Sequence, residues 1–300
     1  DPESLQPNLE WTARLEEAIV EVVGRALDSL RPASAGYGVG SCDFAMNRRE
    51  PTENGFKIGV NPDGPVDHSV PVLDVTGEDG QPIAVVFGYA CHCTTLGGEM
   101  LQICGDYAGF AQEGIERARP GAVALFLTGC GADANPYPRG TVALARQHGQ
   151  SLAEAVGAVL ESDLKALSGS IGSAMVEPSL QFAGPTDRAS YEARLDDGGT
   201  RASHARRMIE DLDAGKAIRA EYPYPIHAFA LGDLTMVTLG GEVVVDYAIR
   251  LRADLAGENQ PLWVVAYADD VFGYVPSLRV LREGGYEGGD AFYYSTFPTP

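Results

Sequence analysis

The chain has 300 residues, of which 45% are hydrophobic and 21% are charged, which is typical of a folded globular protein with a large core. The formal net charge of −20 excludes strong attraction to nucleic acids or anionic bilayers, and it favours neutral or cationic partners. No apolar run approaches the roughly 20 residues of a membrane-spanning helix, so the sequence predicts no transmembrane segment.

The cysteines do not form the pattern of a disulfide framework. Their number is odd and their spacing does not repeat: Cys42, Cys91, Cys93, Cys104 and Cys130. The triplet Cys91-His92-Cys93 has the letters of a metal cluster. However, neighbouring side chains of an extended strand point to opposite faces, so His92 cannot share one site with both cysteines. We therefore predict structural cysteines.

The first third of the chain predicts one helix followed by strands. Apolar residues recur at helical spacing over 11–30, and Arg31-Pro32 ends that helix. The strands expected next are 36–44, 70–75 and 82–90, the last two joined as a hairpin across 77–80, with a polar loop over 47–51.

The remainder alternates buried strands with helices. The expected helices are Asp106 to Ala118, 141–167 and 243–255, and the expected strands are 122–127, 173–182, 226–230, 234–239 and 262–268. Residues 190–218 are charged and predict a helical segment on the protein surface, in which we expect His204 to be exposed.

Four of these strands lead into residues that carry chemistry. The run 82–90 leads to His92, and 122–127 leads into a glycine-bearing loop that holds Asp133 and Asn135. Two later strands lead to Glu242 and toward Tyr274. Because strand ends of one sheet commonly meet at one rim, we predict an α/β fold with a mixed central sheet flanked by helices and a metal site at the strand ends.

The residues alone allow several chemistries at that rim. An imidazole nitrogen and a carboxylate oxygen suit Zn²⁺, which lowers the pKa of a bound water to around 7 and so produces a nucleophile for an amide or ester. Two alternatives remain open. One is a metal-independent hydrolase in which Asp106 or Asp133 acts with His92, and the other is a non-catalytic binding protein on the same scaffold.

Short segments spread over most of the chain form a recognisable pattern in order and spacing. They are Asn61-Pro62-Asp63-Gly64-Pro65-Val66-Asp67, Tyr89-Ala90-Cys91-His92-Cys93-Thr94, Gly105-Asp106-Tyr107-Ala108-Gly109, Gly131-Ala132-Asp133-Ala134-Asn135-Pro136, Leu239-Gly240-Gly241-Glu242, and Gly273-Tyr274-Val275 with Tyr286-Glu287. Together they resemble the catalytic domain of the neutral/alkaline (non-lysosomal) ceramidase family. Members of that family are zinc-dependent amidases that cleave the N-acyl bond of ceramide.

The resemblance implies a role for each candidate residue. In that family zinc is bound by two histidines, a glutamate and a tyrosine; His92 matches the second histidine, Glu242 the glutamate and Tyr274 the tyrosine. Arg48 resembles the substrate-side arginine, with a surface cation in a charged loop as the alternative. Asn135 stands where the family has a serine. An amide cannot attack a carbonyl but can donate a hydrogen bond to an oxyanion, which favours metal-activated water as the nucleophile and weakens ceramide as the substrate.

Two further departures bear on the extent of the domain. The family's first zinc histidine lies in a His-Ser-Gly-Pro segment ahead of the first long helix, and residues 1–10 do not contain it. We expect a chain that begins just after that segment and lacks the family's C-terminal β-sandwich, so that residues 1–300 form a single ceramidase-like catalytic domain. The predicted substrate is a small-molecule or lipid amide, such as an N-acyl lipid or a ceramide-like compound. The oligomeric state stays open. The compartment is open too, because the resemblance implies export whereas unpaired cysteines suit the cytoplasm.

Overall fold

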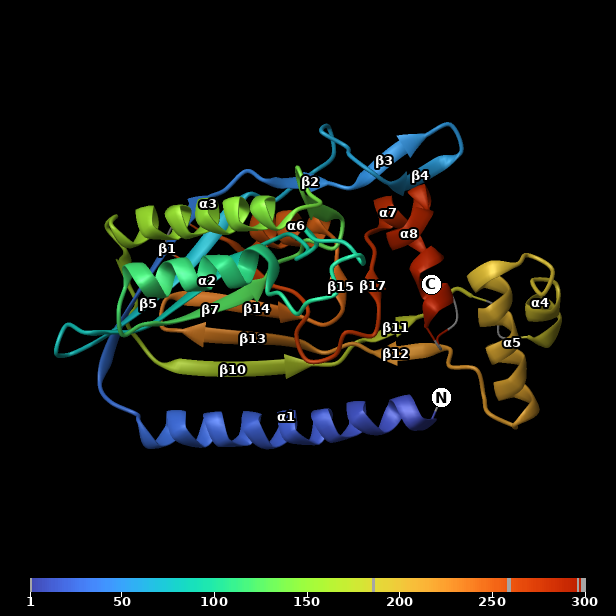
Figure 1. Ribbon diagram of the computed structural model, residues 1–300, viewed down its shortest axis with the longest axis horizontal. Helices are drawn as coiled ribbons and strands as arrows, with labels where there is room; N and C mark the ends of the chain where they lie inside the picture. The colour runs from blue at the N-terminus through green and yellow to red at the C-terminus, as the bar shows by residue number, and fades with distance from the viewer. Residues whose placement is uncertain (1, 185–186, 258–259, 296, 298–300) are drawn as a thin grey trace.

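The computed structural model describes residues 2–184, 187–257, 260–295 and 297, and its centre is a pair of sheets (Figure 1). The larger sheet has the strand order β7-β6-β5-β1-β9, formed by Val123–Thr128, Pro82–Tyr89, Ser69–Gly77, Ala33–Ser41 and Lys165–Ala166. The second has the order β10-β13-β14-β16, formed by Ile171–Val176, Ile226–Leu231, Leu234–Leu239 and Leu262–Val265. Both sheets are mixed, because β6 pairs with β7 and β14 with β16 in parallel, whereas the other pairs are antiparallel.

The two sheets pack face to face, and helices cover the outer face of the larger one. Tyr37 and Leu73 from the larger sheet contact Leu234 and Trp263 from the second in one buried cluster. Helices α2 (Asp106–Ala118) and α3 (Val142–Leu160) lie on the other face of the larger sheet (Figure 1). The mixed α/β class predicted from the sequence is confirmed, with two stacked sheets in place of one central sheet.

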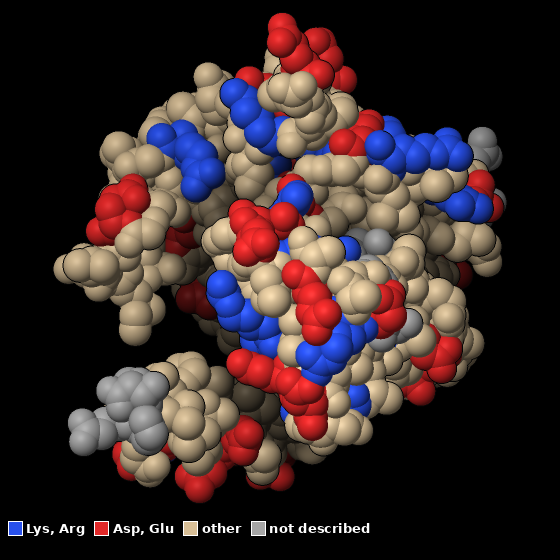
Figure 2. All heavy atoms as spheres, turned by 90° about the vertical axis from the view of Figure 1, so that its right-hand side faces the viewer, with Lys and Arg blue, Asp and Glu red and all other residues tan. Residues whose placement is uncertain are grey.

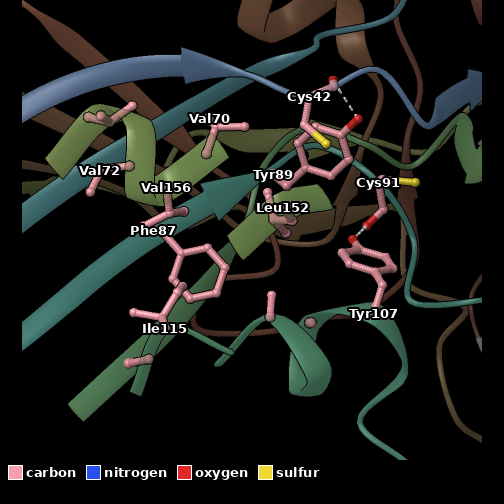
Figure 3. Packing of buried hydrophobic residues seen from close by; sticks show 14 of the residues in the cluster. Cys42, Val70, Val72, Phe87, Tyr89, Cys91, Tyr107, Ile115, Leu152 and Val156 are labelled. Atoms are coloured by element: carbon pink, nitrogen blue, oxygen red, sulfur yellow. Dashed lines mark hydrogen bonds between the residues drawn. The ribbon is translucent and has the colours of Figure 1, made fainter. Parts of the chain in front are cut away.

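The core beneath α2 and α3 also fixes the end of β6. Val70, Val72 and Phe87 of the sheet face Leu152 and Val156 of α3 (Figure 3). Two tyrosine hydroxyls then tie this core to the chain that leads out of β6. The hydroxyl of Tyr89 donates to the carbonyl of Cys42 at 2.8 Å, and that of Tyr107 donates to the carbonyl of Cys91 at 2.6 Å. The residue after Cys91 is His92, so its backbone is anchored from the core.

Short elements complete the fold around the strand ends. The strands are β2 (Ala45–Asn47), β3 (Arg49–Thr52), β4 (Gly55–Ile58), β8 (Ala134–Pro136), β11 (Ser179–Gln181), β12 (Glu221–Pro223), β15 (Glu242–Val243) and β17 (Tyr274–Val275). The helices are α4 (Arg188–Glu192), α5 (Gly199–Asp213), α6 (Val245–Leu255), α7 (Leu278–Glu283), α8 (Gly285–Gly288) and the 3-10 helix Asp290–Tyr294.

The first helix, α1 (Pro2–Asp28), starts earlier than the predicted 11–30 and lies along one side of the molecule (Figure 1). Its described apolar side chains are exposed, Trp11 to 58%. None of the described helices is both long and apolar enough to cross a membrane. On the face shown in Figure 2, basic side chains lie among the acidic ones despite the net charge of −20.

Most predicted elements are present, and the errors have physical causes. The helix from Asp106 to Ala118 and the hairpin of β5 and β6 are confirmed. The loop predicted over 47–51 is wrong, because backbone pairing with β8 and β4 makes this polar segment part of β2 and β3. The helix predicted over 141–167 ends at Leu160, and the chain then adds β9 to the larger sheet. His204 is not exposed but fully buried, with its Nε2 atom 2.7 Å from the carbonyl of Phe297.

Candidate active site

His92 follows the end of β6, and hydrogen bonds of its backbone and of its ring fix its position. Its backbone N–H donates to the carbonyl of Ala134 at 3.1 Å, and its Nε2 lies 3.0 Å from the carbonyl oxygen of Ala132. A carbonyl can only accept, so Nε2 carries the ring proton and Nδ1 is left as an unprotonated acceptor. Burial, followed by the charge of Arg48, lowers the pKa of His92 to about 3, so the imidazole is neutral at pH 7.

Glu242 and Tyr274 are neighbours because β15 and β17 pair in parallel, with Glu242 opposite Tyr274. The turn before β15 requires glycine: Gly241 has φ +71°, and a Cβ there would lie 2.8 Å from the carbonyl oxygen of Gly273. Burial raises the pKa of the Tyr274 phenol above its usual value, and the Glu242 carboxylate adds to the rise against the opposing effect of Arg48.

Tyr267 also lies in the site, although no sequence pattern places it there. Its hydroxyl donates to Glu242 Oε2 at 3.1 Å and lies 3.3 Å from His92 Nδ1. Its backbone has φ +58°, a left-handed conformation that is rare for a bulky residue. The sequence predicts a buried strand over 262–268 that includes Tyr267; β16 instead ends at Val265, and the turn that follows directs the ring into the site.

Arg48 connects the two sides of the site and is 6% exposed, which rules out its reading as a surface cation. Pairing of β2 with β8 brings this residue beside Asn135. Its Nη1 donates to Asn135 Oδ1 at 3.3 Å, its Nη2 to the Tyr274 hydroxyl at 2.9 Å, and its Nε to Glu287 Oε1 at 2.7 Å. Arg48 thus links the phenol of one segment to the amide of another.

Asn135 presents its amide nitrogen to the site. The amide oxygen accepts hydrogen bonds from Arg48 and from the Thr94 hydroxyl, the latter at 3.1 Å. Because both donors use the oxygen, the nitrogen is the group that can donate to a ligand. This is the arrangement expected of an oxyanion-stabilising residue.

Glu287 accepts a hydrogen bond from Arg48, and it is a second residue that the predicted site does not contain. Its second oxygen accepts from Arg49 Nη1 at 2.6 Å, and the glutamate is only 2% exposed. A buried carboxylate between two guanidinium groups is compensated on both sides. Glu287 therefore positions Arg48 without facing the site itself.

The two aspartates considered as partners of His92 have structural bonds instead. Asp133 Oδ1 accepts from the backbone N–H of Val245, the first residue of α6, at 2.9 Å, and its Oδ2 accepts from Asn47 at 3.4 Å. Asp106 accepts from the backbone N–H groups of Leu96 and Tyr107, at 3.0 and 2.7 Å. These bonds favour structural roles over catalysis with His92.

Asp133 should make stability depend on pH. Burial raises its pKa to about 6, from about 3.9 in an unfolded chain, so folding favours the protonated form. Its contribution is complete below about pH 4 and is lost as the pH rises through about 6, an effect of roughly 3 kcal/mol. Asp133→Asn should remove this loss, so the free energy of unfolding of the variant minus that of the wild type should increase between about pH 4 and pH 7. Urea unfolding across this range measures it, and a constant difference would count against the raised pKa.

The oxygen and nitrogen atoms of the site have the spacing of metal ligands. The Tyr267 hydroxyl lies 3.1 Å from Glu242 Oε2 and 3.3 Å from His92 Nδ1, the ring nitrogen whose lone pair is available to a cation. Atoms bound to four-coordinate zinc at about 2.0–2.1 Å are separated by about 3.3 Å. The Tyr267 hydroxyl has one proton, which it donates to Glu242, so the lone pair on His92 Nδ1 receives none. A bound cation would satisfy that lone pair. Among the described residues no group of three or more His, Cys, Asp and Glu side chains gathers, so phenol oxygens would have to complete the donor set.

Comparison with known proteins supports the architecture. No protein-family model and no curated protein matches the sequence. Among solved structures, neutral ceramidase from Pseudomonas aeruginosa superposes with a TM-score of 0.66 at 18% identity, covering 91% of this chain and 51% of that chain. A ceramidase complexed with C2 gives a TM-score of 0.64 at 18% identity, with 88% and 51% covered. The chain thus spans about half the length of these proteins, and over that span it has the fold of neutral ceramidase.

Proposed function

We propose that the protein is a hydrolase that cleaves the amide bond of an N-acyl compound, with zinc as its cofactor. The observation that supports this most is the meeting of His92, Glu242 and Tyr274 with Arg48 at one point, from four separate segments. The similarity to neutral ceramidase makes amide hydrolysis the first reaction to test.

The proposed roles follow from the chemistry of each group. His92, Glu242 and Tyr274 would hold zinc, which when bound supplies a Lewis acid and an activated water. Tyr267 orients the imidazole and the carboxylate through its hydroxyl. The guanidinium of Arg48 has N–H groups beyond its three contacts, so it can also donate to the carbonyl oxygen of a substrate.

Charge develops on that carbonyl oxygen as the amide is attacked, and Arg48 and Asn135 would stabilise it. Their geometry is fixed in advance, since Arg48 is bonded to Glu287 and Asn135 to Thr94. Donors that need no reorganisation are the most effective in such a role. Asn135 is not a nucleophile, so water attacks the carbonyl carbon directly.

Arg48→Lys should lower kcat by about 10²-fold, with a smaller effect on KM. A single ammonium group cannot contact Glu287, Tyr274 and Asn135 together, so the carbonyl oxygen loses a fixed donor. Steady-state kinetics on an N-acyl substrate gives both parameters. Arg146→Lys is the control, because Arg146 is exposed on α3 and lies over the ring of Phe110. A kcat within twofold of the wild type would exclude Arg48 from the reaction.

The proposed function is tested by offering the zinc-loaded protein a panel of amides. Suitable members are a short-chain ceramide, an N-acylethanolamine and an N-acyl amino acid, with release of the free amine as the readout. We expect turnover of at least one. A panel that binds without turnover would instead support a non-catalytic binding protein on the same scaffold.

A further inference from the structure

Two pockets border the candidate site, and each is lined by one hydrogen-bond partner of Arg48. The first, of about 210 Å³, reaches Glu242 and Tyr274 and is lined mainly by aromatic rings: Phe272, Tyr286, Phe292 and Tyr294. The second, of about 220 Å³, reaches Asn135 and is lined by Met46, Ile58, Val60, Tyr137 and Arg139. Arg48 is bonded to Tyr274 and to Asn135, one bordering residue from each pocket. A carbonyl held by Arg48 therefore lies between the pockets, with one arm of an amide pointing into each.

The two pockets differ in charge. Arg139 is exposed in the second pocket, and it forms no ion pair with any carboxylate of the described residues. The lining of the aromatic pocket has no lysine or arginine among the residues described, and the carboxylate of Glu242 borders it. The second pocket thus offers an anionic group a cationic partner that the lining of the first pocket does not.

On this basis, and resting on the proposed function, we infer that the substrate is an N-acyl amino acid whose carboxylate is bound by Arg139 and whose acyl chain lies in the aromatic pocket. Hydrolysis breaks the C–N bond of the amide: the oxygen of water joins the acyl carbon, a proton passes to the amine, and a fatty acid and an amino acid leave. A water molecule takes up about 30 Å³ of the liquid, so each pocket has room for about seven waters. This space suits a single amino acid in one pocket and a medium-length acyl chain in the other.

The test compares N-octanoylglycine with N-octanoylglycinamide, which differ only by a carboxylate against a carboxamide. The wild type should favour the acid by about tenfold in kcat/KM, the factor expected for one charge-assisted contact at a partly exposed site. Arg139→Gln should bring the ratio close to one by lowering kcat/KM for the acid, and Arg139→Lys should restore most of the preference. Arg146→Gln removes the same charge from the α2–α3 surface and should keep the wild-type ratio.

Calorimetry with the hydrolysis-resistant analogues N-(octylsulfonyl)glycine and N-(octylsulfonyl)glycinamide separates this inference from the proposed function. Tighter binding of the acid that disappears in Arg139→Gln supports the inference even if no amide is cleaved, and such a lack of cleavage would contradict the proposed function alone. If the wild type cleaves both amides equally, or if the preference survives in Arg139→Gln, the inference is overturned while the hydrolase proposal stands.

Discussion

Replacing Glu242 with glutamine is expected to lower kcat/KM for amide hydrolysis by about 10³-fold and to reduce the amount of bound zinc. The variant keeps the size of the side chain and an oxygen that can accept from Tyr267, so the fold should be retained. It removes the negative charge that would balance a dication beside His92, whose Nε2 lies 3.7 Å from the carboxylate. Kinetics together with metal analysis of the purified variant measures both effects.

Glu192→Gln provides the matched control for that experiment. Glu192 is exposed on α4 and pairs with Arg188 on the surface, so its replacement should change neither activity nor zinc content. Unaltered zinc content and activity in Glu242→Gln would show that Glu242 has no role in the site. Loss of activity with zinc fully retained would leave it a role in orienting the substrate rather than in binding metal.

Glu287→Ala is expected to produce the largest loss of stability, about 3–5 kcal/mol. Its carboxylate lies between Arg48 and Arg49, whose side chains are 7% and 1% exposed. Removing it leaves buried Arg48 without a carboxylate partner among the described residues, whereas Arg49 keeps its ion pair with Glu283 at 3.1 Å. Urea unfolding should show a lower midpoint with an unchanged dependence on denaturant. Because Glu287 positions Arg48, activity should fall in the variant even where it remains folded.

An ion pair on the surface serves as the control for how much of that loss of stability comes from burial. Glu21 and Arg25 on α1 are 3.9 Å apart and about 70% exposed, so Glu21→Ala should cost no more than about 0.5 kcal/mol. If Glu287→Ala were as mild as this control, the buried arginine pair would not depend on Glu287, and the fixed position of Arg48 would need another cause.

The meeting of the strand ends could be predicted from the sequence. Each buried run ends at a reactive residue, and the structure brings His92, Glu242 and Tyr274 together, with Arg48 and Asn135 alongside. Their roles as ligands and oxyanion donors remain predictions. The strand pattern is informative here because a short apolar run has few ways to be buried, and its polar end must then lie at the rim.

The residues that sequence reasoning missed depend on conformation or on distant partners. Tyr267 reaches the site only because its backbone is left-handed, which an aromatic residue in an apolar run does not indicate. Glu287 belongs to one of the segments that carry the family resemblance, but its role comes from burial against Arg48 and Arg49, which the sequence does not indicate. Similarly, alternation within a strand cannot tell which of two stacked sheets the strand joins.

The apolar spacing of α1 shows the limit of periodicity. The pattern predicts a helix correctly, yet the apolar residues that carry the pattern are not buried: Trp11 and Ile19 are 58% and 52% exposed. Periodicity predicts the secondary structure, whereas burial of the apolar side chains depends on which other elements pack against the helix.

The most direct measurement is the release of glycine from N-octanoylglycine by the protein before chelation, after chelation and after zinc is returned. We predict hydrolysis that is lost on chelation and restored by about one equivalent of zinc. Hydrolysis that continues unchanged without metal would contradict a metal centre at His92 and Glu242.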